Sequence, residues 1–343
     1  MKNLIYSSLT ILLLLQGCGS ETNTKTENSN IGGNGEDLNA NPTEDNSSTT
    51  RGTTETATVD DLETLEEPRF IDLPINPTFS RVSANIVKEE QSNLYWQDNI
   101  EAKTTIKKYA DAENYCATLT LDGIDSWRLP TYNELLTIVN YERHQPSIYD
   151  IFSHTNDKEY WTQTKLASDE NLFRWTIDFK NGVVNFQTGA YPSSYSTIHN
   201  VRCVSDKFAN RRKQERNFSK NGDIVTDNIH HLLWQDSLNT KVDKYSFTDA
   251  VSYCDNLSLG QYSSGWRVPT VKELASLVDV RAYDPSIDGN FTNTAYNDAY
   301  WTSDSMVLVD SYRWDINFKD GFINYGGTDH ASFNQYVRCV RNQ

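Results

Sequence analysis

The chain carries one series of motifs twice, and this duplication constrains the fold of its 343 residues more than any other feature. The first copy has Tyr-Trp-Gln-Asp at 95–98, Tyr-Cys at 115–116, Trp-Arg-Leu-Pro-Thr at 127–131, Tyr-Trp-Thr at 160–162 and Val-Arg-Cys-Val at 201–204. The second copy repeats the series in the same order from 233 to 340, at an offset of 136 to 140 residues. Solenoid units span only about 20 to 50 residues. We therefore expect two whole domains in series, at 78–206 and 217–343.

The first 18 residues have the pattern of a lipoprotein signal peptide. Lys2 supplies a positive charge, and the apolar stretch 4–15 is too short to span a bilayer comfortably. The stretch ends in Leu-Gln-Gly-Cys at 15–18, which resembles a bacterial lipobox. The resemblance implies cleavage before Cys18 and acylation of that cysteine, and Gly19 is compatible with sorting to the outer membrane. The alternative is an ordinary signal peptide with a chance cysteine. We expect a lipid-anchored protein of the cell envelope, with the outer membrane and surface exposure favoured.

The segment 19–77 is rich in Asn, Thr, Glu, Ser, Gly and Asp, and this composition predicts a disordered polar tether. The formal net charge of −16 argues against nucleic acid as a partner, because phosphates require a basic face. Between the two copies, the segment 207–216 contains Arg211, Arg212, Lys213 and Arg216. We interpret this basic run as a solvated linker and not as a binding patch.

Four cysteines remain after Cys18, and an even number in an exported chain predicts disulfides. Four cysteines allow three pairings. Each copy holds one early and one late cysteine, and domains that fold alone should close their own bridges. The repeat therefore predicts the bonds Cys116–Cys203 and Cys254–Cys339.

Each copy is expected to have an α+β fold: a short opening strand that ends at the Trp-Gln-Asp turn, then two helices, then an antiparallel sheet. Apolar residues at helical spacing around Cys116 predict a first helix with the cysteine on its buried face. Thr131 with Glu134, and Thr270 with Glu273, form capping boxes that begin a second helix. Alternation over 175–179 followed by Asn-Gly at 181–182 predicts a β-hairpin. A last strand carries Val-Arg-Cys-Val, so that the disulfide joins the first helix to the closing strand.

Chemistry shared by the two copies should leave shared residues, and the histidines fail this test. None of the six recurs at a matching position; they are His144, His154, His199, His230, His231 and His330. The recurring carboxylates are chiefly Asp98/Asp236, Asp111/Asp249 and Glu134/Glu273. Turn formation, helix dipoles and capping account for them in that order. Neither a catalytic residue nor a metal or cofactor site is predicted.

Three arginines and four tryptophans also recur. For the arginines Arg128/Arg267, Arg174/Arg313 and Arg202/Arg338 we favour internal ion pairs, the alternative being capture of an acidic glycan group. The recurring tryptophans are interpreted as core residues, the alternative being sugar-binding platforms; they are Trp96/Trp234, Trp127/Trp266, Trp161/Trp301 and Trp175/Trp314. Non-repeated aromatics such as Tyr191, Tyr195 and Tyr262 are the better candidates for ligand contact.

The motif series resembles the C-terminal domain family of the Legionella collagen-like protein, over both copies and about 250 residues. The resemblance implies a C-type-lectin-like fold related to the sulfatase-modifying factors, and a role in surface adhesion with sulfated glycans as ligands in the type member. This chain lacks collagen-like Gly-x-y repeats and is acidic. We expect a non-enzymatic binding module for a glycan or an extracellular protein. The alternatives are an enzyme on a sulfatase-modifying-factor-like scaffold, which would need free cysteines, and a structural envelope lipoprotein without a soluble ligand.

Overall fold

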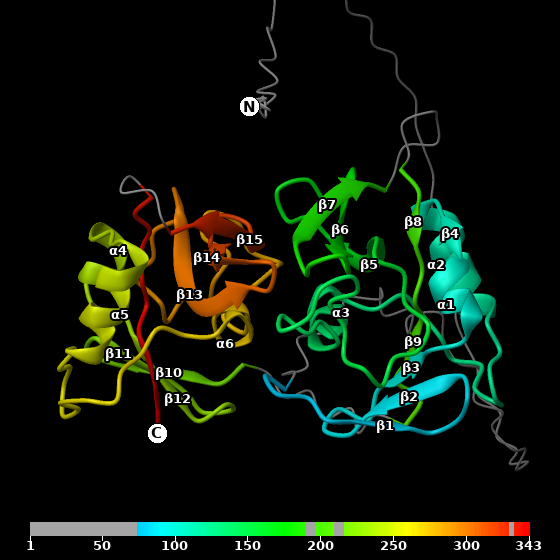
Figure 1. Ribbon diagram of the computed structural model, residues 1–343, viewed down its shortest axis with the longest axis horizontal. Coiled ribbons are helices and arrows are strands. Elements are labelled where there is room, and N and C mark those ends of the chain that lie inside the picture. Colours follow the sequence, from blue (N-terminus) through cyan, green and yellow to red (C-terminus); the bar gives the residue numbers. More distant parts are fainter. Residues whose placement is uncertain (1–73, 190–196, 209–215, 329–332) are drawn as a thin grey trace, which may run out of the picture. The chain divides into compact units, whose positions relative to one another are not determined.

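The computed structural model describes residues 74–189, 197–208, 216–328 and 333–343 (Figure 1). We call 74–208 repeat 1 and 216–343 repeat 2. Repeat 1 contains β1 (Phe79–Arg81), β2 (Ile86–Glu89), β3 (Tyr95–Gln97), α1 (Ile100–Thr104), β4 (Ile106–Lys107), α2 (Tyr109–Thr118), α3 (Tyr132–Thr137), β5 (Glu159–Lys165), β6 (Phe173–Asp178), β7 (Val184–Thr188), β8 (His199–Asn200) and β9 (Val204–Ser205). Repeat 2 contains β10 (Phe218–Asn221), β11 (Ile224–Asp227), β12 (Leu232–Gln235), α4 (Asn239–Val242), α5 (Phe247–Asp255), α6 (Val271–Ala275), β13 (Ala299–Met306), β14 (Val309–Asn317), β15 (Phe322–Gly327) and β16 (Val340–Asn342).

Each repeat is a mixed α and β unit with two sheets, where the sequence predicted one. The first sheet has the order β1-β2-β3-β9 in repeat 1 and β10-β11-β12-β16 in repeat 2, with all neighbours antiparallel. It joins the opening strands of a repeat to its closing strand. The prediction did not include the opening hairpin, because it assigned strands at the start of each copy only near Trp-Gln-Asp.

The second sheet holds the predicted hairpin. Its order is β4-β8-β5-β6-β7 in repeat 1 and β13-β14-β15 in repeat 2. Trp175 pairs with Phe186 and Ile177 with Val184, as the alternating pattern predicted. Gly182 has φ +97 at the turn, a conformation that favours glycine. The sheet also has one parallel pair, since Tyr160 of β5 faces Asn200 of β8.

The helices begin where the sequence predicted. Thr131 accepts a hydrogen bond from the backbone N–H of Glu134, whose side chain returns to the Thr131 backbone, and the same capping box starts α6 at Thr270. In α2 the buried residues are Tyr109, Ala112 and Cys116, which is the predicted face. The short helices α1 and α4 were not predicted.

The predicted final strand is wrong in one respect. Arg202 and Cys203 lie between β8 and β9 and belong to no strand. The reason is a contact with a residue distant in the chain, because the side-chain carbonyl of Gln97 accepts the backbone N–H of Cys203 at 3.1 Å, where a strand neighbour would otherwise stand. The closing segment therefore crosses from one sheet to the other at the disulfide.

The two repeats share one buried cluster of apolar side chains. The hydroxyl of Tyr132 donates to the carbonyl of Gly321 at 3.0 Å, and the rings of Tyr141 and Trp314 pack edge to face at 4.8 Å. Phe322 likewise packs against Trp175. Because these contacts bury large aromatic rings, variants are best compared in the full chain and not in isolated repeats.

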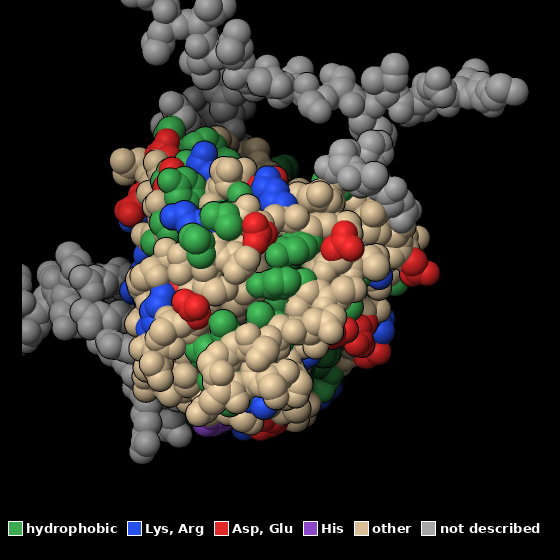
Figure 2. Space-filling model, turned by 90° about the vertical axis from the view of Figure 1, so that its left-hand side faces the viewer, with side chains coloured by type: hydrophobic (Ala, Val, Ile, Leu, Met, Phe, Trp, Pro, Cys, Tyr) green, Lys and Arg blue, Asp and Glu red, His purple; other side chains and the backbone are tan. Residues whose placement is uncertain are grey.

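The described surface carries mixed charge. On the face of repeat 2 drawn in Figure 2, basic and acidic side chains are interspersed with apolar ones. The turn between β13 and β14 exposes Val307, Leu308 and Val309. No single sign of charge dominates this face.

Candidate functional site

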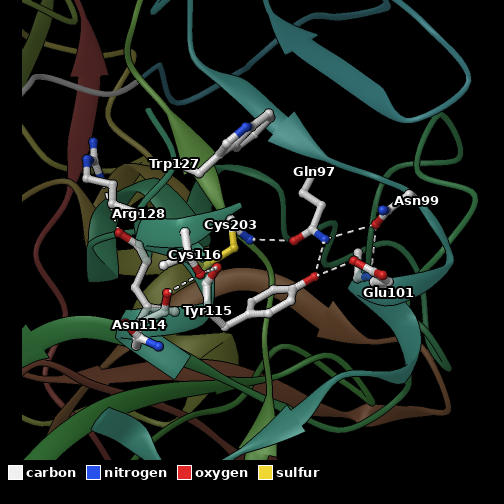
Figure 3. The surroundings of a disulfide bond; sticks show 12 residues. Gln97, Asn99, Glu101, Asn114, Tyr115, Cys116, Trp127, Arg128 and Cys203 are labelled. Carbon is white, nitrogen blue, oxygen red and sulfur yellow. Dashed lines mark hydrogen bonds between the residues drawn. A yellow bond between two sulfur atoms is a disulfide. The ribbon is translucent and has the colours of Figure 1, made fainter. Parts of the chain in front are cut away.

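The disulfides are the first feature that the motifs position. Cys116 is bonded to Cys203 and Cys254 to Cys339, which is the pairing expected from the duplication. Beside the first bond, the Gln97 amide donates to the Tyr115 hydroxyl at 2.9 Å, and that hydroxyl donates to Glu101 (Figure 3). Repeat 2 has the matching contact from Gln235 to Tyr253. The Trp-Gln and Tyr-Cys motifs therefore hold the bridge in place.

The shared Asp98 and Asp236 are structural, although not through the predicted turns. Asp98 is fully buried and lies 3.3 Å from the guanidinium of Arg202, which is also fully buried. Asp98 accepts the backbone N–H groups of Ser153 and His154 as well. Asp236 and Arg338 repeat this pair at 2.8 Å. Each pair joins the end of an opening strand to the closing segment.

The other shared arginines are also engaged inside the fold. Arg128 forms a bidentate pair with Glu134, and Arg267 does so with Glu273, as the sequence analysis favoured. Arg174 lies over the ring of Tyr109 at 4.7 Å, and Arg313 lies over Phe247. The eight shared tryptophans are at most 3% exposed, which confirms them as core residues.

The remaining candidates from the sequence, the non-repeated tyrosines and the basic linker, do not form a common binding surface among the described residues. Tyr262 packs against Trp266 and under the guanidinium of Arg341 at 4.4 Å. Tyr191, Tyr195, Cys18 and the basic triplet at 211–213 lie outside the described residues. Arg216 donates to the carbonyls of Leu277 and Val278, so this end of the predicted linker is bonded to repeat 2 and not solvated.

A group of polar side chains on the second sheet of repeat 1 was not predicted. We call it the Glu159 cluster, and it comprises Glu159, Thr176, Asn185, Gln187 and His199. The Asn185 amide donates to Glu159 Oε1 at 2.9 Å, and the Gln187 amide donates to Glu159 Oε2 at 3.1 Å. His199 Nδ1 lies 3.1 Å from the same Oε2. Three strands, β5, β7 and β8, thus meet at one carboxylate, and Thr176 of β6 lies opposite Asn185.

Burial governs the charge of this cluster. It lowers the pKa of His199 to about 4, with nearby Asp178 opposing the change, so that the ring is neutral at pH 7. Burial also raises the pKa of Asp178, and the negative charge of Glu159 adds to that rise. The His199 ring packs edge to face on Trp161 at 4.6 Å. The cluster therefore combines a neutral imidazole with a carboxylate.

Repeat 2 holds different residues at the same places. Glu159 corresponds to Ala299, Thr176 to Asp315, Gln187 to Gly326 and His199 to Gln335; only Asn185 is kept, as Asn324. Asp315 accepts the Gln335 amide at 2.9 Å, and burial raises the pKa of Asp315 to about 6. Because four of the five residues differ between the copies, the Glu159 cluster is not part of the duplicated motifs.

The sequence did contain a signal for the cluster. In β7, the polar Asn185 and Gln187 alternate with the apolar Val184 and Phe186. Such positions point to the face of the sheet away from the main core. Placing His199 beside them required the parallel pairing of β8 with β5, which local patterns do not reveal.

No group of three or more His, Cys, Asp or Glu side chains in residues 74–343, apart from the three gaps, could hold a metal ion. Within those residues, no helix has the length and apolar character needed to cross a bilayer.

Comparison with known proteins completes the assignment. The family model of the Lcl C-terminal domain matches residues 85–205 and again 223–341. Comparison with curated proteins gives no match. The two matched segments contain both disulfides, both buried Asp–Arg pairs and both capping boxes. The chain therefore belongs to the Lcl C-terminal domain family and carries two tandem copies of that domain.

Proposed function

We propose that the protein is a lipid-anchored component of the cell envelope. It acts as a surface binding module without enzymatic activity, and its tether holds two Lcl C-terminal domains away from the membrane. Its ligand is a glycan or an extracellular protein. The proposal is supported by the observation that the charged residues shared by both copies are bonded within the fold. The recurring Asp98, Glu134, Arg128 and Arg202 are bonded within the scaffold, which leaves binding to residues that differ between copies.

The C-type-lectin-like fold is part of this proposal. A disulfide between the first long helix and the closing segment supports it, as does the pairing of the opening strands with the closing strand. Folds of this kind present variable residues on a scaffold held by constant ones.

The state of the cysteines supports binding over catalysis. A sulfatase-modifying-factor-like enzyme requires reactive thiols, and Cys116, Cys203, Cys254 and Cys339 are all bonded in pairs. We expect titration of the native protein with a thiol reagent to find no free thiol in the two domains. A reactive thiol among these four residues would favour the enzyme.

Anchoring is tested by a Cys18→Ala substitution in the producing cell. We expect the unaltered protein to take up radiolabelled palmitate and to sediment with the envelope, because several acyl chains anchor a protein stably. The variant should lose the label and appear in the soluble fraction. Unchanged labelling or unchanged sedimentation would contradict the anchor.

Binding is tested by applying the full chain to arrays of oligosaccharides and of extracellular matrix proteins. Saturable binding to members of either array supports the proposal. An absence of binding to both arrays would contradict it and favour a structural envelope protein.

A further inference from the structure

The hydrogen bonds within the Glu159 cluster leave some of its oxygen atoms free to accept further hydrogen bonds. The amide nitrogens of Asn185 and Gln187 are directed to Glu159, so their carbonyl oxygens face the opposite way within each planar amide. An ionised carboxylate has about four lone-pair positions, and the two amides together with His199 Nδ1 occupy three of them. Glu159 remains 19% exposed. The cluster therefore presents oxygen acceptors to whatever contacts it.

Two buried atoms of the cluster have no hydrogen-bond partner among the described residues. Thr176 is fully buried and its hydroxyl is unpartnered; it lies opposite Asn185 in the β6–β7 register and so on the same face. His199 Nε2 is also unpartnered. Buried polar atoms are rarely left unsatisfied, because each one costs about 1–3 kcal/mol. These atoms are a second indication that the face is completed by something outside the described chain.

The charge of the face limits what can complete it. Glu159 and Asp178 bring carboxyl groups to it, and the neutral His199 does not offset them. Of the nearby cations, Arg174 lies over the ring of Tyr109 and Lys107 over that of Tyr115, whereas Lys158 and Lys180 lie near Asp178 and oppose the rise of its pKa. An anionic ligand would meet repulsion and few donors.

We infer that the Glu159 cluster of repeat 1 binds a neutral, hydroxyl-rich saccharide, whose O–H groups supply the donors that the cluster lacks, and that it rejects sulfated glycans. The inference rests on the proposed binding function and assigns it a site and a ligand class. Neighbouring hydroxyls of a sugar ring can each donate to a carboxylate or an amide oxygen.

Repeat 2 does not offer this site. Ala299 and Gly326 stand where repeat 1 has Glu159 and Gln187. A Cβ atom at Gly326 would lie 2.4 Å from the ring of Phe333, so this ring fills the place of the Gln187 side chain. The residue at the matching place in repeat 1 is the smaller Thr197. The two copies are therefore unequal, and repeat 1 is the binding copy.

The test applies the full chain to an array of neutral, sulfated and amino-containing oligosaccharides and then measures affinity for the best neutral probe. We expect neutral oligosaccharides to bind. Glu159→Gln should weaken binding by about tenfold or more, since a hydrogen bond to a charged group is lost. Gln187→Gly, which installs the residue of repeat 2, should weaken it to a similar degree and serves if the first variant folds poorly.

The matched control is Asp315→Asn in repeat 2, which should leave affinity within about twofold because that carboxylate already accepts Gln335 inside the fold. Thermal unfolding of each variant checks that the domains are intact. Binding only to sulfated or only to amino-containing probes would overturn the inference. So would an equal loss of affinity in the Asp315 variant.

Failure of this inference is distinct from failure of the proposed function. If the chain binds a matrix protein and no neutral oligosaccharide, the binding function stands and the saccharide site is wrong. If the chain binds nothing on either array, both are wrong.

Discussion

Repeat 1 and repeat 2 agree closely in what is buried and differ in what the second sheet presents. Both have a disulfide, a buried Asp–Arg pair and an Arg–Glu pair on the capping box. On the matching face of the second sheet, repeat 1 has the Glu159 cluster, whereas repeat 2 has the buried carboxyl of Asp315 and the partly exposed ring of Phe333. The comparison teaches that the motifs define a scaffold. Any difference in function between the copies is carried by residues outside the motifs.

The disulfides should contribute equally in the two repeats and give the largest effect. They span 87 and 85 residues. Replacing both cysteines of one bond by serine is expected to cost about 4–5 kcal/mol in the chain-entropy model. Chemical denaturation of the full chain measures the free energy of unfolding of each double variant. A difference above about 2 kcal/mol between the two variants would break the equivalence of the scaffolds.

The buried Asp–Arg pairs come next. Arg202→Met and Arg338→Met each leave an aspartate buried without its partner, which is expected to cost about 3–5 kcal/mol. Asp98 also contacts Arg81, and Asp236 contacts Lys220, both of which are partly exposed. The same denaturation experiment reports the cost, and a loss below about 1 kcal/mol in either repeat would show that these outer cations suffice.

Acidity should affect the two second sheets with opposite sign. The folded pKa of His199 is about 4, below its ordinary 6.5, so its contribution is complete above pH 6.5 and is lost as the pH falls through about 4. The folded pKa of Asp315 is about 6, above its ordinary 3.8, so its contribution is complete below pH 3.8 and is lost as the pH rises through about 6. Each change amounts to roughly 2–3 kcal/mol.

Two variants separate these contributions. His199→Gln should remove part of the loss of stability on the acid side, and Asp315→Asn should stabilise the chain at pH 7 but not at pH 4. Melting temperature recorded against pH for both variants is the measurement. If both substitutions shifted the pH dependence of the melting temperature in the same direction, the second sheets of the two repeats would not respond to acid with opposite sign.

The smallest effect is expected at Phe333. Its side chain is 43% exposed, so Phe333→Thr, which installs the residue found at 197, should cost only about 1 kcal/mol. Thr197→Phe in repeat 1 should be equally mild for stability but should cover the Glu159 cluster. Denaturation and saccharide binding together test this pair. A cost above about 3 kcal/mol at Phe333 would mean that the ring is part of the core and not a cover.

The sequence predicted features that are settled over a few residues or by the duplication itself. The capping boxes at Thr131 and Thr270 and the turn at Gly182 depend on local bonds and on φ, so their residues identify them. The disulfide pairing followed from one early and one late cysteine per copy. Predicting these features did not require the pairing of strands that are distant in the chain.

What the sequence did not predict depends on contacts between distant strands. The break at Arg202 and Cys203 arises because Gln97, more than 100 residues earlier, bonds to Cys203. The Glu159 cluster needs β8 placed beside β5. Asp98 was assigned to a turn because its partner Arg202 is equally distant in the chain. Register across a sheet is a tertiary property, and short patterns do not fix it.

The position of the disulfides determines how far each repeat can be stretched. Mechanical tension that enters at one end of a repeat and leaves at the other passes from α2 through the sulfur atoms to the closing segment, bypassing the residues between the two cysteines. A stretch of 87 residues would extend by roughly 300 Å if it were released. With the bond intact, the residues between the two cysteines bear no tension and do not extend. If one end of the protein is anchored and a ligand pulls on the other, only the segments outside the two disulfide loops would extend. Reduction of the disulfides would release the loops and increase the length to which the chain can be stretched.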